Sequence, residues 1–236
     1  MNQPPILVAL DTPTASEAHR LAAELVPHVA GFKVGLELLM GPGPSLIAGL
    51  RELGRPIFVD AKLHDIPNTV AAAARQLGAA GARWVTVHAS GGRPMMEAAV
   101  AGLGDGARDE AAGILAVTVL TSLDDLTDLG VGDSIPDHVE RLATLASNAG
   151  VEGVVCSARE IRVCAAAAPS LIRVVPGIRP GGVDHHDQAR VATPRAAMDE
   201  GADLLVIGRA ITTAPDPAEA AATIAQTILE RRGPGG

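Results

Sequence analysis

Apolar residues in this chain gather into short runs that recur at fairly even spacing. Eight such runs, rich in Val, Ile and Leu, lie at residues 6–11, 31–38, 56–62, 83–89, 113–121, 153–157, 171–178 and 203–210. Stretches rich in Ala and Leu separate most of them and are long enough for helices, for example 15–29, 68–81, 138–150 and 217–232. Continuous apolar strands that alternate with amphipathic helices are typical of a parallel sheet with helices outside it.

The number of these units predicts the fold class. Eight strand–helix units within 236 residues fit an α/β fold of the (β/α)8 TIM-barrel type, whose usual length is roughly 250 residues. A doubly wound sheet is the alternative. No linker divides the chain, so we expect a single domain over residues 1–236, with a short flexible tail at about residues 232–236.

Composition excludes several classes of protein. Aromatic residues make up only 1% of the chain and Tyr is absent, so the core must consist mainly of Ala, Val, Leu and Ile. The net charge of −8 and the lack of a basic stripe argue against a nucleic-acid partner. No apolar run approaches the roughly 20 residues that a membrane span needs.

The cysteines and the first residues of the chain indicate the cellular compartment to expect. Cys156 lies in an apolar run, where we expect it to pack as a small hydrophobic residue, and two cysteines are too few for a disulfide framework. The start "MNQPPILVAL" has no basic region before its apolar run and is not expected to be a signal peptide. We therefore expect a cytoplasmic protein.

Polar residues stand where most of the predicted strands end. Active sites of such barrels lie at the C-terminal ends of the strands, so these residues are the candidates for chemistry. They are Asp11, Lys33, Asp60, Lys62, His88, Ser90, Thr121, Ser122, Ser157 and, after Gly208 in the last strand, Arg209.

The use of lysine narrows this set. The chain has 17 Arg and only two Lys, and both lysines, Lys33 and Lys62, fall on this predicted rim. Lysine offers a compact charge and a proton that it can release, whereas Arg stays protonated. Two buried structural ion pairs, Asp11 with Lys33 and Asp60 with Lys62, are the alternative, but burying such pairs commonly costs stability.

The stretch "DAKLHD" suggests what the charges do. Asp60 and Lys62 are two residues apart on a strand and should point to the same side, while Asp65 follows in the loop and could reach its own barrel or a neighbouring one. Flanking carboxylates favour the charged form of Lys62. A charged lysine is a poor nucleophile but a good cation and proton donor, which favours stabilisation of a carbanion over a Schiff base.

The last two strands point to a phosphate site. "PGIRPGGVDHHDQ" (176–188) and "IGRAI" (207–211) supply Gly together with Arg179, Gln188 and Arg209, and barrels often bind phosphate after strands 7 and 8. His185 and His186 are adjacent in a polar loop, where solvated histidines are more common than metal ligands. The roles of these two residues, and of His64 and His88, stay open.

Several motifs in order resemble one enzyme family. "DAKLHDIPNT" resembles the Asp-x-Lys-x-x-Asp-Ile-Pro-Asn-Thr signature of the orotidine 5′-monophosphate decarboxylases, and the resemblance covers the whole chain. "LVALD", "FKVGLEL", "AVTVLTS", "VPGIRP", "DQARVATP" and "IGRAIT" resemble other segments of the bacterial form. This chain departs from the bacterial pattern at "DAKLHD", where bacterial members often have Leu and Phe flanking the lysine, but these are packing positions.

The resemblance implies a reaction and a role for each residue. Such a carboxy-lyase converts orotidine 5′-monophosphate to uridine 5′-monophosphate in de novo pyrimidine biosynthesis, without a metal or other cofactor. Lys62 would stabilise and protonate carbon 6, with Asp60 beside it. The resemblance also implies a homodimer with shared sites, in which Asp65 and Thr69 cross from the partner subunit. In the family, Asp11 and Lys33 bind the ribose, and Thr121 and Pro176 contact the base. Gln188 and Arg209 hold the phosphate, and Arg179 and Gly208 lie in the same two segments.

Two alternative functions share much of this pattern. Keto-gulonate-phosphate decarboxylases and hexulose-phosphate synthases have the same barrel and Asp-x-Lys-x-x-Asp core but use magnesium; "DIPNT", "PGIRP" and the late "DQ" favour the orotidine enzyme. A non-catalytic barrel that binds a nucleotide is the second alternative. The lysine pair argues against it, since binding alone needs no proton donor.

Overall fold

The strands of this protein alternate between two apolar environments. The computed structural model describes residues 3–107, 111–180 and 192–229. In β1 (Ile6–Ala9), Ile6 and Val8 pack outward against helices, whereas Leu7 and Ala9 belong to a second apolar cluster. That second cluster is completed by Phe58, Trp84, Leu115, Val174 and Val206. Successive side chains of a strand face opposite sides, so the second cluster fills the inside of a closed sheet.

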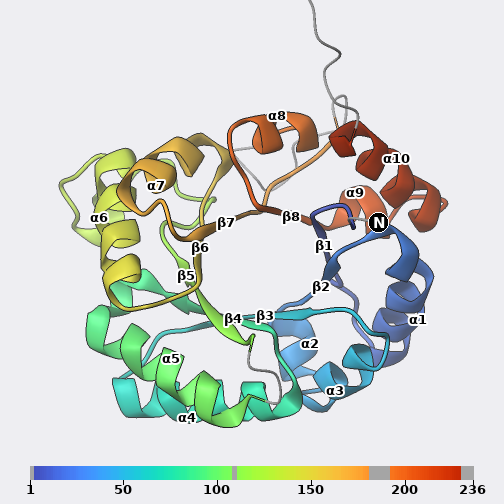
Figure 1. Cartoon of the computed structure of the whole chain (residues 1–236), viewed down its shortest axis with the longest axis horizontal. Helices are drawn as coiled ribbons and strands as arrows, with labels where there is room; N and C mark the ends of the chain where they lie inside the picture. Colours follow the sequence, from blue (N-terminus) through green and yellow to red (C-terminus); the bar gives the residue numbers. More distant parts are fainter. Residues whose placement is uncertain (1–2, 108–110, 181–191, 230–236) are drawn as a thin grey trace, which may run out of the picture.

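The described strands form a closed parallel barrel in sequence order (Figure 1). After β1 come β2 (Gly31–Val34), β3 (Ile57–Leu63), β4 (Trp84–His88), β5 (Gly113–Val117), β6 (Gly153–Val155), β7 (Ile172–Val175) and β8 (Leu204–Ile207). β8 pairs with β1 and closes the ring, with Leu7 opposite Val206. This is the (β/α)8 barrel that the sequence predicts, and the doubly wound sheet is wrong.

The helices surround the barrel (Figure 1). They are α1 (Ala15–Leu25), α2 (Leu36–Met40), α3 (Ser45–Arg51), α4 (Pro67–Ala80), α5 (Arg93–Gly106), α6 (Ile135–Asn148), α7 (Ile161–Ala167), α8 (Pro194–Asp199), α9 (Arg209–Thr212) and α10 (Pro217–Leu229). Short 3₁₀ turns lie at Val26–His28, Ala89–Gly91, Thr127–Leu129 and Ala158–Glu160. None of the described helices has both the length and the apolar character that crossing a membrane requires.

Several strands are shorter than the apolar runs that predict them. The run 31–38 is a strand only as far as Val34, and Leu36–Met40 forms α2 instead. The run 113–121 is a strand only to Val117, and Arg209 opens α9. Beyond these strand ends, the described backbone makes many of its hydrogen bonds in turns and short helices.

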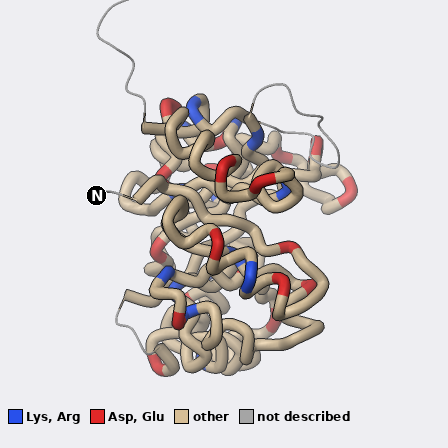
Figure 2. The backbone as a smooth tube through the Cα atoms, turned by 90° about the vertical axis from the view of Figure 1, so that its right-hand side faces the viewer, with Lys and Arg blue, Asp and Glu red and all other residues tan. Residues whose placement is uncertain are grey.

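The outer surface carries charges of both signs. In the view of Figure 2, Lys and Arg are interspersed with Asp and Glu along the described tube, without a continuous basic stripe. Cys156 is fully buried, as expected for a residue that packs as a hydrophobe. Its hydrogen bond with Cys164, and then its burial, raise the pKa of the Cys156 thiol well above its usual range, so this thiol is a poor nucleophile.

Candidate active site

Strand alternation brings two charged residues inside the barrel. In β2, Phe32 and Val34 face the helices, so Lys33 faces inward. In β3, Ile57 and Val59 face outward and Phe58 faces inward, so Asp60 also points into the barrel. Inward residues near the C-terminal ends of strands lie at the mouth, where barrel enzymes have their active sites.

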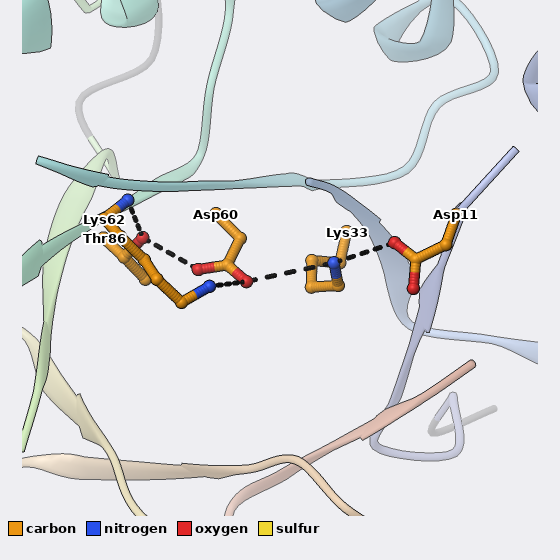
Figure 3. A network of polar contacts seen from close by, with 5 residues as sticks. All are labelled: Asp11, Lys33, Asp60, Lys62 and Thr86. Carbon is orange, nitrogen blue, oxygen red and sulfur yellow. Dashed lines mark hydrogen bonds and ion pairs between the residues drawn. The ribbon is translucent and has the colours of Figure 1, made fainter. Parts of the chain in front are cut away.

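Four charged side chains form one line across this mouth (Figure 3). Lys62 Nζ lies 2.7 Å from Asp60 Oδ2, and the same oxygen lies 3.9 Å from Lys33 Nζ. Lys33 Nζ in turn donates to Asp11 Oδ1 at 3.2 Å. Acids and bases therefore alternate, and each lysine contacts at least one carboxylate. We call Asp11, Lys33, Asp60 and Lys62 the charged array.

Burial differs along the charged array. The side chains of Lys33 and Asp60 are only 11% and 15% exposed, whereas Lys62 is 32% and Asp11 57% exposed. Lys33 and Asp60 thus sit deep, where charge–charge attraction is screened less than at the surface. Lys62 retains an open side through which its ammonium group can meet a ligand.

Gly35 leaves room for the charged array. A Cβ atom at this position would lie 3.0 Å from Lys33 Nζ and 3.4 Å from Asp11 Oδ1. Any side chain would therefore crowd the Lys33 ammonium group and force it to shift. The sequence predicted no role for Gly35, and the glycine in "KVGLE" was its only signal.

A cavity of about 280 Å³ opens over the charged array. Its floor is apolar and includes Phe58, Val117 and Val155, all on inward positions of their strands. Its far wall comes from the segments after β7 and β8. These segments, together with the segment after β5, line the cavity with Thr121, Pro176, Gly177, Arg179, Gly208 and Arg209.

Two of these wall residues have backbone or burial features that fit a binding site. Gly177 has φ of +75°, a conformation that favours glycine. The Arg179 side chain is deeply buried, at 9% exposure, although it carries a permanent charge. The cavity thus has a charged array at one side, guanidinium groups at the other and an apolar floor between them. This suits a flat, partly apolar molecule with an anionic end.

Three predicted site residues are not among the residues seen to line the cavity. Asp65 and Thr69 are exposed and do not line it. Asp65 Oδ1 instead accepts the backbone N–H of Ile66 at 2.6 Å, beside the exposed side chain of that isoleucine. Gln188 lies outside the described residues, as do His185 and His186.

His64 and His88 lie together beside the charged array. Their ring centroids are 5.5 Å apart. Burial lowers the pKa of His88 below its usual value, and the nearby His64 and Lys62 lower it further, against a smaller opposing effect of Asp60. Within the described residues no group of three or more His, Cys, Asp and Glu side chains is arranged to hold a metal ion.

Comparison with protein families agrees with this geometry. Residues 4–224 match the model of the orotidine 5′-phosphate decarboxylase / HUMPS family. The chain belongs to this family. The match spans every described strand of the barrel, including all four residues of the charged array.

Individual relatives of the decarboxylase family cover nearly the whole chain. The orotidine 5′-phosphate decarboxylase of Anaeromyxobacter dehalogenans is 52% identical over 223 residues, which are 93% of this chain and 96% of the relative. That of Dichelobacter nodosus is 50% identical over 231 residues, covering 97% and 100%.

A solved structure of the decarboxylase family has the same fold. The orotidine 5′-phosphate decarboxylase of Lactobacillus acidophilus superimposes with a TM-score of 0.85 at 35% identity, over 97% of this chain and 100% of the other. The resemblance to the orotidine decarboxylases found in the sequence is therefore confirmed.

Proposed function

We propose that this protein decarboxylates orotidine 5′-monophosphate to uridine 5′-monophosphate in pyrimidine biosynthesis. The observation that carries the proposal is the charged array beneath a cavity whose far wall holds arginines. Relatives of about 50% identity are named for this activity. The family model covers more than one activity. The choice of this activity over the magnesium-dependent alternatives therefore rests on the names of the relatives.

Lys62 is the proton donor of the proposed reaction. The bond between carbon 6 and the carboxylate breaks, carbon dioxide leaves, and the electron pair remains on carbon 6. The Lys62 ammonium group stabilises this developing negative charge and then transfers a proton to carbon 6. Water restores the proton to Lys62 after the product leaves. No cofactor takes part in this sequence of steps.

Asp60 keeps the Lys62 ammonium group in place. Its Oδ2 atom lies 2.7 Å from Lys62 Nζ, and its carboxylate is largely buried between the two lysines. Holding a catalytic group at the reacting atom can contribute several kcal/mol to the rate. In this proposal Asp60 lies against the substrate carboxylate, and its part is to position Lys62.

The other cavity residues bind the rest of the nucleotide. Asp11 and Lys33 bind the ribose hydroxyls, and Thr121 and Pro176 contact the pyrimidine. Arg179, Gly208 and Arg209 line the cavity wall and would hold the phosphate, which a guanidinium group binds with paired hydrogen bonds. Gln188 joins them in this proposal on the family resemblance alone.

We also propose a homodimer whose sites are shared. Asp65 and Thr69 are exposed and do not line the cavity of their own barrel, and the neighbouring Ile66 is 66% exposed. Such a position suits residues that complete a partner's site. The partner subunit would place Asp65 and Thr69 at the mouth of this barrel. We further propose a cytoplasmic location, since the free, buried Cys156 and Cys164 suit a reducing compartment.

One assay tests the activity and its alternatives together. Purified protein is mixed with orotidine 5′-monophosphate in the presence of a metal chelator, and the fall in substrate absorbance is followed. We expect decarboxylation at a rate that the chelator does not change. Activity that disappears with the chelator would favour the magnesium-dependent alternatives. Tight binding of uridine 5′-monophosphate without turnover would favour a non-catalytic barrel.

A further inference from the structure

Thr86 is fully buried in the middle of β4 and joins the charged array (Figure 3). Its hydroxyl oxygen accepts the backbone N–H of Lys62 at 2.8 Å. Its hydroxyl proton is donated to Asp60 Oδ1 at 3.0 Å. Trp84 lies two residues earlier and belongs to the inner cluster, so alternation also turns Thr86 into the barrel.

The strand opposite Thr86 is irregular. Val59 pairs with Val85 and Leu63 pairs with Val87, so β3 advances by four residues while β4 advances by two. The bulge therefore contains Asp60, Ala61 and Lys62. Bulges often occur beside active sites, where they redirect a side chain.

Lys62 has an unusual backbone conformation within this bulge. Its φ is 47°, the one positive value among the non-glycine residues that the structure describes. Such a conformation persists only where surrounding contacts hold it. The hydrogen bond from the Lys62 N–H to the Thr86 hydroxyl is a contact of this kind, because the bulge has removed this N–H from the regular ladder.

The contacts form a closed ring. Lys62 N–H donates to Thr86, Thr86 donates to Asp60 Oδ1, and Asp60 Oδ2 accepts from Lys62 Nζ. Both ends of Lys62, its backbone and its ammonium group, are thus fixed by the same two neighbours. Each Asp60 oxygen has its own donor, so the carboxylate cannot rotate without losing both.

We propose that Thr86 is a positioning residue for the decarboxylation, which it serves by holding Lys62 and Asp60 in their reactive arrangement. The inference rests on the proposed function. Thr86 does not line the cavity, so it acts through the other two residues. A hydroxyl group is required because it both accepts and donates a hydrogen bond at one atom.

Three variants separate this role from simple packing. Thr86→Val keeps the branched shape but leaves the Lys62 N–H and Asp60 Oδ1 without their partner. Thr86→Ser keeps the hydroxyl group. The matched control is Thr118→Val: Thr118 is 5% exposed in the same barrel, but its hydroxyl donates to the Val155 carbonyl oxygen at 3.2 Å, away from the charged array.

We expect the loss of the Thr86 hydroxyl to lower kcat and to leave the binding of uridine 5′-monophosphate nearly unchanged. Thr86→Val should lower kcat by about thirtyfold or more, while the dissociation constant for uridine 5′-monophosphate stays within about threefold, since the phosphate and ribose contacts are untouched. Thr86→Ser and Thr118→Val should keep kcat within about threefold of wild type. If Thr86→Val does not fold, Thr86→Ala replaces it in the comparison with Thr86→Ser.

A second measurement does not depend on turnover. Lys33 and Lys62 are the only lysines of the chain, so acylation of each side chain can be followed by peptide mass spectrometry. Loss of the Thr86 hydroxyl should loosen Asp60 and raise the acylation rate of Lys62 relative to Lys33. Thr118→Val should leave this ratio unchanged.

The outcomes decide between the alternatives. An inactive wild-type protein would overturn the proposed function and the role of Thr86 with it. With an active wild type, three results would each overturn the role of Thr86 alone. These are unchanged kcat in Thr86→Val, equal losses in Thr86→Val and Thr118→Val, or a loss in Thr86→Ser as large as that in Thr86→Val.

Discussion

The Lys33 ammonium group lies 3.9 Å from the Asp60 carboxylate, so the two lysine–aspartate pairs of this barrel form one array. Two separate structural ion pairs would need no such bridge. Because Lys33 contacts carboxylates from the segment after β1 and from β3, its charge offsets the repulsion between them. The array can therefore keep Asp60 beside Lys62 at the place where a substrate carboxylate would arrive.

Lys62→Ala should abolish decarboxylation while the fold persists. Removing both the cation and the proton donor should lower kcat/KM by at least roughly a thousandfold. Lys62→Arg is the matched control, because it keeps a charge that cannot release its proton, and it should also be inactive. Turnover assays with circular dichroism check this. Activity within about tenfold of wild type, or about 1.4 kcal/mol of barrier, would contradict the role of Lys62.

Subunit mixing should restore activity to two inactive variants. In a mixed dimer of Lys62→Ala and Asp65→Ala, one site carries both changes and the other carries neither. Random exchange of subunits should give up to about a quarter of wild-type activity, because half of the dimers are mixed and each has one intact site.

The control for subunit mixing uses two residues of the same barrel. Lys62→Ala mixed with Asp60→Ala should recover nothing, since both residues lie in one charged array and every site keeps one change. Failure of the first mixture to recover activity, under conditions where exchange is demonstrated, would show that Asp65 acts within its own subunit.

Arg209→Ala should lower kcat/KM for the nucleotide substrate and leave that for a substrate without phosphate nearly unchanged. A charged hydrogen bond of this kind contributes roughly 1.5–3 kcal/mol, so kcat/KM for the nucleotide should fall roughly ten- to hundredfold. The slow turnover of the nucleoside should barely change, because phosphate binding energy serves only the full substrate.

A surface arginine provides the control for Arg209. Arg162→Ala removes a side chain that is 78% exposed and paired with Glu200, and neither residue lines the cavity. It should leave both substrates unaffected. An equal fractional loss on both substrates in Arg209→Ala would mean that this residue supports the barrel and not the phosphate.

The stability of the protein should fall in mild acid because of His88. The pKa of His88 is lowered from 6.5 in the folded state, mainly by burial. Between the folded and unfolded pKa values the unfolded chain binds a proton that the folded protein does not. The free energy of unfolding therefore decreases as the pH falls through 6.5 toward the folded value.

Comparing denaturant unfolding across this pH range in wild type and His88→Gln measures the contribution of His88. The variant should lose less stability in acid than wild type. His19→Gln, which changes an exposed histidine of α1, should leave the pH dependence as it is in wild type. A pH dependence in His88→Gln as steep as that of wild type would assign the acid sensitivity to other groups.

Much of this protein can be predicted from its sequence, because the relevant signals are local. The apolar runs predict all eight strands, since burial on both faces requires continuous hydrophobic sequence. Lys33 and Lys62 stand out in the sequence because all other basic residues, histidine aside, are Arg. Regular alternation predicts that Asp60 and Lys62 share a side of β3. The bulge interrupts that alternation, yet their ammonium and carboxylate groups do meet.

Other features depend on which residues become neighbours in space. The ion pair between Lys33 and Asp60 joins β2 to β3. The Thr86 hydroxyl joins β4 to the bulge in β3, where it contacts the Lys62 backbone N–H and the Asp60 carboxylate. Sequence period gives the side that a residue faces but not the register of adjacent strands. Only the closed barrel fixes that register, and so only the tertiary structure decides that a threonine in the middle of an apolar strand contacts the reactive lysine.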